Sequence, residues 1–140
     1  MPLKLDQAQA IVAAALSYAR AKSLKPMGFV VLDERGALSA AAVEDGASLA
    51  RWKVAFGKAN GALSMGVSSR KLHDMAIERP HFVASLASAF SEGLVPVPGG
   101  VLIRDAEGAV VGAAGASGDT SDNDEAALIA AIEDAGLGSS

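Results

Sequence analysis

Apolar side chains recur every three or four residues near the N-terminus, and this spacing predicts a helix that begins at Asp6 and ends before Pro26. A second helix is predicted after Gly46, shorter helices on either side of Pro80, and a last helix after Ser121. The expected buried face of the second helix consists of Leu49, Trp52, Ala55, Phe56, Ala59 and Leu63.

Short apolar runs bounded by turn residues predict the strands. Residues 29–32 and 37–40 flank the turn at 33–36, a pattern typical of a β-hairpin. Three further strands are predicted at residues 94–97, 101–104 and 109–117. Because tight turns join antiparallel strands, and helices lie at both ends and in the middle of the chain, we predict one α+β domain over residues 1–140.

Two glycines interrupt the second helix. Gly57 and Gly61 each cost about 1 kcal/mol in a helix interior relative to alanine, so a compensating contact is expected there. Either the helix packs tightly against the sheet, or another backbone or a flat ligand approaches it closely.

Composition and charge exclude several classes of protein. The chain has no cysteine, which excludes disulfides and thiolate metal sites, and its net charge of −4 disfavours nucleic acid as a partner. Residues 1–80 carry 11 Lys/Arg against 7 Asp/Glu, whereas residues 81–140 carry 1 against 9. We expect these parts to attract each other, within the fold or between subunits. The many small residues are a further indication of self-association.

The N-terminal sequence lacks the pattern of a signal peptide, and no apolar run approaches the roughly 20 residues of a membrane span. The expectation is therefore a cytoplasmic protein that does not enter a membrane.

Most catalytic and metal-binding motifs are absent. The glycines of residues 112–118 do not have the spacing of a phosphate-binding loop, and no histidine follows Ser117 as hydrolase order requires. The acidic residues 119–125 lack an EF-hand pattern, so we predict no metal site and expect them to complement a helix dipole. His73 and His81 remain: each could be an axial haem ligand or an ordinary surface histidine.

Five segments, in order along the chain, resemble motifs of the GlcG/HbpS family of haem-binding proteins. They are residues 30–38 (VVLDERGAL), 44–47 (EDGA), 55–59 (AFGKA), 98–103 (PGGVLI) and 111–118 (VGAAGASG) followed by Asp124-Glu125. The resemblance implies a profilin-like, three-layer α/β/α fold with a five-stranded antiparallel sheet. It also implies similarity to the C-terminal domain of PduO-type proteins, and a homo-oligomer, either a dimer or a larger ring.

These motifs suggest a binding site for a small anionic ligand. Gly99 and Gly100 can present backbone N–H groups to a carboxylate, Lys58 can pair with a haem propionate or a substrate acid, and Asp45 can orient Lys58. This hypothesis requires that the bend at residues 98–100 and the lysine converge on one cavity. In the alternative, Lys58 and Asp45 form a structural ion pair and the glycines only turn the chain.

Three functions remain open from the sequence. The chain could bind haem or another tetrapyrrole, act as an enzyme or accessory protein on a small hydroxy- or oxo-carboxylic acid, or serve as a structural oligomerisation module without a ligand. Three departures from the family pattern remove a cation and a hydroxyl from the expected pocket: Val43-Glu44 in place of an arginine, Asn60-Gly61 in place of a threonine, and Leu102 in place of a proline.

Overall fold

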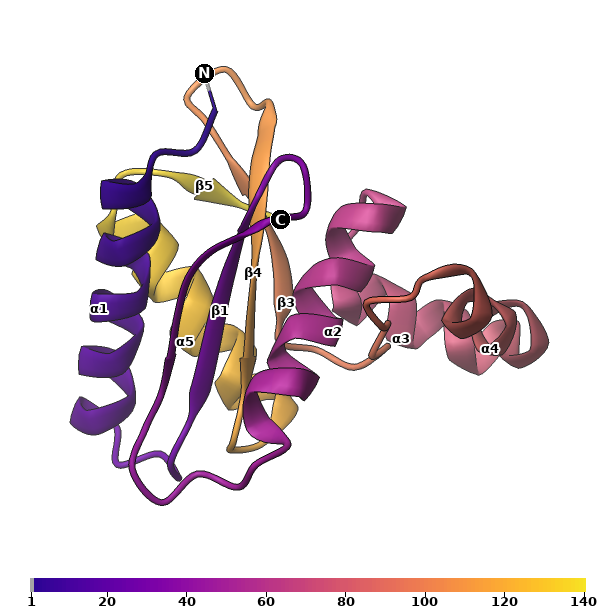
Figure 1. The fold of residues 1–140 in the computed structure, drawn as a ribbon, viewed down its shortest axis with the longest axis horizontal. Coiled ribbons are helices and arrows are strands. Elements are labelled where there is room, and N and C mark those ends of the chain that lie inside the picture. The colour runs from indigo at the N-terminus through magenta and orange to yellow at the C-terminus, as the bar shows by residue number, and fades with distance from the viewer. Residues whose placement is uncertain (1) are drawn as a thin grey trace.

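The computed structural model describes residues 2–140, which form five helices and five strands in layers (Figure 1). In chain order these are α1 (Leu5–Ala21), β1 (Gly28–Asp33), β2 (Leu38–Val43), α2 (Arg51–Met65), α3 (Ser69–Glu78), α4 (Pro80–Ala89), β3 (Gly100–Arg104), β4 (Val110–Ser117), α5 (Ser121–Asp134) and β5 (Gly138–Ser139). The predicted α+β class and the hairpin are confirmed.

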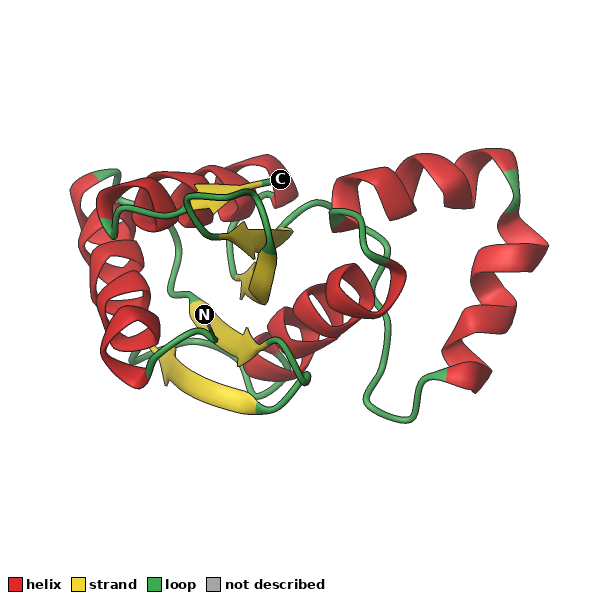
Figure 2. Ribbon diagram, turned by 90° about the horizontal axis from the view of Figure 1, so that it is seen from above, coloured by secondary structure: helices red, strands yellow, loops and turns green. Residues whose placement is uncertain are grey.

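The strands form one antiparallel sheet in the order β2-β1-β4-β3-β5. Helices α1 and α5 cover one face and α2 covers the other, which gives the expected three layers (Figure 2). The hairpin turn depends on Asp33, whose carboxylate accepts the N–H groups of Arg35 and Ala37, and on Gly36, which has φ +83°.

The strand predicted at residues 94–97 is wrong, because this segment packs on a helix and not on the sheet. Val95 N–H donates to the carbonyl of Gly57 at 3.2 Å, and Leu94 lies against Gly61. A Cβ on Gly57 would lie 2.7 Å from Val95 Cγ2. The close approach of another backbone therefore explains both helix glycines, and the fifth strand is the C-terminal β5, which pairs with β3.

The buried face of α2 differs from the predicted one. Leu49 precedes the helix and is 90% exposed, and Trp52 is 46% exposed, so the prediction that both are buried is wrong. Small residues face the sheet instead, and a Cβ on Gly115 of β4 would lie only 1.9 Å from the carbonyl oxygen of Ala55. The helix backbone thus rests directly on β4, and only residues without bulky side chains allow this.

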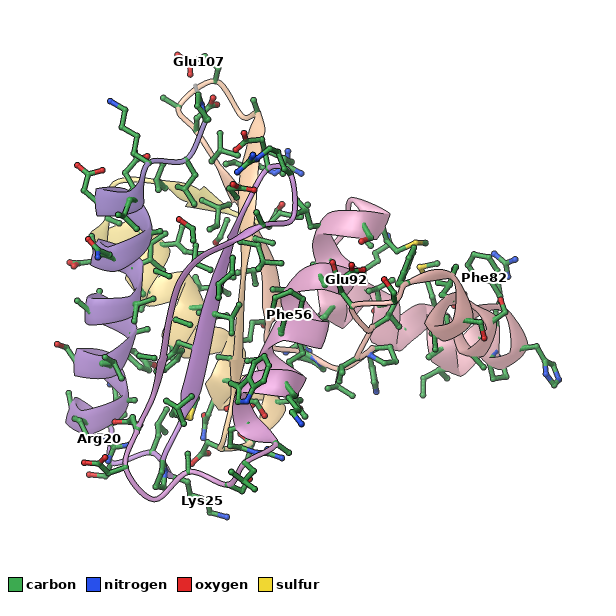
Figure 3. The ribbon with its side chains drawn as sticks, viewed as in Figure 1. Arg20, Lys25, Phe56, Phe82, Glu92 and Glu107 are labelled. Atoms are coloured by element: carbon green, nitrogen blue, oxygen red, sulfur yellow. The ribbon has the colours of Figure 1, made fainter. Side chains whose placement is uncertain are left out.

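Helices α3 and α4 form an arm, residues 69–89, that extends away from the sheet (Figure 1). Among the helices and strands of residues 2–140, α4 contacts only α3. Phe82 lies on this arm, far from the layers of the body (Figure 3). No helix between residues 2 and 140 combines the length and the apolarity that crossing a membrane requires.

The predicted attraction between the two parts of the chain is confirmed within the fold. Arg70 pairs with Asp122 and Glu125 of α5. Beyond the C-terminal end of α1, where Figure 3 labels Lys25, the backbone N–H of Lys25 donates to the Asp119 carboxylate at 2.9 Å. Cations and amides from the first 80 residues therefore hold the N-terminal end of α5 in place.

Gly115→Ala should destabilise the protein by at least about 3 kcal/mol, because the new methyl group overlaps the α2 backbone. Urea unfolding measures this loss. Gly138→Ala is the matched control, since its Cβ would meet nothing closer than 3.7 Å, and its effect should be small. Equal losses in the two variants would show that α2 does not rest on β4 as described.

Asp119 should contribute to stability in a pH-dependent way. The N–H of Lys25, the Asn123 amide and the N–H of Thr120 lower the pKa of Asp119 from 3.8 to about 2. The folded state therefore binds fewer protons than the unfolded state in this window, so the contribution is full above pH 3.8 and is lost towards pH 2. Asp119→Asn should be less stable than the wild type near neutral pH, and the gap should close in acid. A pH-independent gap in urea midpoints would contradict the assignment.

Candidate functional site

Lys58 is the central residue of the predicted site, and it is buried. Its side chain is 2% exposed, and Nζ donates to the carbonyl of Ala116 at 2.9 Å and to Asp124 Oδ2 at 3.1 Å. The other oxygen of Asp124 accepts the N–H of Asp119 at 2.9 Å. The ammonium group is therefore fully enclosed between α2, the end of β4 and the first turn of α5.

Gly99 and Gly100 lie directly against this lysine. A Cβ on Gly99, which has φ +119°, would lie 2.8 Å from Lys58 Nζ, and one on Gly100 would lie 2.3 Å from the Lys58 carbonyl oxygen. The N–H of Gly100 donates to the buried Ser69 Oγ at 2.7 Å, and this hydroxyl donates back to the Gly100 carbonyl at 3.2 Å. The bend and the lysine do converge, but protein atoms fill the space between them.

The electrostatics of the pair are set by burial. Removal from water lowers the pKa of Lys58 and raises the pKa of Asp124, because burial penalises the charged form of each group. Their mutual attraction and hydrogen bond oppose both shifts. Arg51, which donates to Ser117 Oγ at 2.9 Å, adds a nearby positive charge that lowers the pKa of Lys58 further.

Asp45 does not take part in this cluster. It is exposed in the turn after β2, and the carboxylate that orients Lys58 belongs to Asp124. The expected Lys58–Asp45 pair is thus replaced by one between residues 66 positions apart. The only sequence feature that points to this pair is the acidic start of α5, for which the expected role is to complement the helix dipole.

Five surface hollows of residues 2–140 lie between α1 and α5, along β2, beside Asp6 and around Asn60. None of these is lined by Lys58, Gly99 or Gly100. The geometry favours the structural alternative for these three residues, and their role in binding a ligand stays a prediction.

His73 is an accessible side chain with a distinct setting on the outer face of α3. Its side chain is 45% exposed, and neither ring nitrogen is hydrogen-bonded to residues 2–140; the nearest carboxylate, Asp74, is 3.6 Å from Nδ1. Arg70 lies three residues before it and Ile77 four residues after it, so the three share one side of the helix. Arg70 is half-exposed and Ile77 is 72% exposed. Ser69 and Leu72 are the buried residues of this helix, and Ser69 lies one turn before His73, so the stripe borders the buried side.

His81 is exposed in the first turn of α4, and its helical neighbours Ala84 and Ser85 are small. The structure therefore does not bring the two histidines and the Lys58 cluster together. Residues 2–140 contain no group of three or more His, Cys, Asp or Glu side chains that could hold a metal ion.

A protein family and several solved structures are similar to this chain. The family described as haem degrading protein, HbpS-like, matches residues 3–133. A solved PduOC–haem complex superposes with a TM-score of 0.87 at 22% identity, covering 99% of this chain and 98% of that one. HbpS gives 0.81 at 23% (95% and 89% covered), and the Klebsiella pneumoniae protein ORFY gives 0.85 at 22% (96% and 90% covered). No curated protein sequence matches the chain.

The Lys58–Asp124 pair should behave as a structural unit. Lys58→Met should cost about 3–5 kcal/mol in urea unfolding, because it leaves the Asp124 carboxylate buried without its cation. The double variant Lys58→Met/Asp124→Leu should lose less than the sum of the two single losses. The exposed pair Arg35–Asp33 provides the control, and Arg35→Met should have a far smaller effect. Additive losses at Lys58 and Asp124 would refute the pairing.

Proposed function

Since the chain belongs to the HbpS-like family, we propose that it binds haem or a related tetrapyrrole on the exposed face of α3. One observation carries the proposal: Arg70, His73 and Ile77 form a single accessible stripe of a cation, an imidazole and an apolar side chain. The family's description and the solved PduOC–haem complex support the choice of ligand.

Each residue of this stripe fits one part of a haem group. An imidazole with a free ring nitrogen is a common axial ligand of haem iron. Ile77 would lose its contact with water when covered by a flat apolar ring, which favours binding. The Arg70 guanidinium would pair with a propionate, and its bonds to Asp122 and Glu125 hold it in position at the end of α5.

The other candidate residues fit haem less well. His81 lacks a large exposed apolar neighbour one turn further along its helix. A carboxylate could reach Lys58 only if the contacts of Gly99 and Gly100 opened. For the same reason, no specific observation favours the small hydroxy- or oxo-carboxylic acid as the ligand.

The proposal is tested by adding hemin to the purified protein and following the Soret band. The wild type should give a saturable, shifted band. His73→Ala should abolish the shift, because the axial nitrogen is lost, whereas the matched variant His81→Ala should retain it. A non-saturable response in the wild type, or an unchanged shift in His73→Ala, would overturn the proposal.

A further inference from the structure

A hollow of about 370 Å³ lies beside the C-terminal half of α2. Three segments form it: the turn between β1 and β2, the last turns of α2, and the loop after α4, where Figure 3 labels Glu92. The residues of the α3 stripe do not line this hollow, so the two places are separate. Its polar lining side chains are Glu34, Arg35, Asn60, Ser64 and Glu92.

Asn60 presents a hydrogen-bond acceptor to the hollow. The residue is only 8% exposed, and Nδ2 donates to the Gly93 carbonyl at 2.8 Å, which fixes the orientation of the amide. Oδ1 therefore faces away from Gly93. No donor within residues 2–140 bonds to this oxygen, whereas every fully buried side-chain N or O atom of these residues has a partner. Oδ1 thus lies at the surface that Asn60 contributes to the hollow, held in place by the helix.

The charged groups around this oxygen favour a cation. Arg35 adjoins Glu34 but is bonded to Asp33 at 2.9 Å, so the charges of Arg35 and Asp33 offset each other. Glu34 and Glu92 are exposed, and neither forms an ion pair within residues 2–140. Glu92 accepts only the neighbouring hydroxyl of Ser91, at 2.8 Å. Two carboxylates at the hollow are therefore left without a cationic partner.

The end of α2 adds a second preference for positive charge. The helix ends at Met65, Gly66 caps it with φ +72°, and its last turn has no basic side chain. Carbonyl groups at a helix C-terminus carry a partial negative charge, which a nearby cation stabilises. Because Ser64 of this last turn lines the hollow, a cation bound there lies within one turn of the helix end.

We propose that this hollow binds a primary alkylammonium ion, the protonated form of a small aliphatic amine. Its N–H groups donate to Asn60 Oδ1, and its charge faces Glu34 and Glu92. Its alkyl chain covers Leu63, the half-buried apolar side chain of the lining, which reaches towards the turn at Gly36. A metal ion fits less well, because residues 2–140 contain no group of three side chains suited to hold one.

The proposal is tested by titrating the isotope-labelled protein with butylammonium chloride at constant ionic strength. The side-chain NH₂ signals of Asn60 report directly on the site, since a donor at Oδ1 polarises the whole amide. They should shift saturably. Tetramethylammonium is an isomer of butylammonium with the same charge and no N–H group, and it should bind about tenfold more weakly. Equal binding of the two cations, or no saturable shift with butylammonium, would overturn the proposal.

Charge-removing variants test the location of the site. Glu92→Gln and Glu34→Gln should each raise the Kd for butylammonium about two- to fivefold, because each removes one exposed charge from the hollow. Glu107→Gln removes an exposed charge from the turn between β3 and β4 and should leave the Kd unchanged (Figure 3). All three side chains are exposed, so the fold should be retained. Equal effects of Glu92→Gln and Glu107→Gln would show attraction to the overall charge and would reject the site.

Discussion

The buried ion pair between Lys58 and Asp124 is the constraint on which the rest of the structure depends. It joins the middle of α2 to the start of α5 and to the end of β4, so it connects the helical layers across the sheet. Its ammonium group lies over Gly99 and its backbone carbonyl lies over Gly100, where any side chain would collide. A buried charge pair is costly unless every bond is satisfied, and here each partner has a second hydrogen bond.

This constraint determines where a ligand can be sought. The glycine and lysine motifs that resemble the family build the connection between layers, and the Lys58 side chain is only 2% exposed. Side chains that a ligand can reach lie instead on α3. The buried Ser69 of this helix is hydrogen-bonded to Gly100. The same cluster that closes the predicted site therefore positions the helix whose outer side carries Arg70, His73 and Ile77.

Local patterns predicted much of the fold, and long-range pairs account for what they missed. The hairpin and the helices could be predicted, because turn residues and periodicity are local signals. The closeness of Lys58 to the bend at residues 98–100 was expected only from the motifs that resemble the family. The Asp124 partner could not, since 66 residues separate it from Lys58. Leu94 and Val95 resemble a strand, but two glycines made a helix surface available to them. Periodicity alone predicts that Trp52 is buried, whereas the close contact of Ala55 with Gly115 leaves no room for large side chains between α2 and the sheet.

The most direct test of this account is an amide NMR spectrum of the labelled protein during titration with paramagnetic hemin. Signals nearest the bound iron broaden, so the spectrum identifies the face that is occupied. The account predicts that broadening is strongest in α3 around His73 and weaker at Lys58 and Gly99. Broadening centred on the Lys58 cluster, with α3 unaffected, would contradict it.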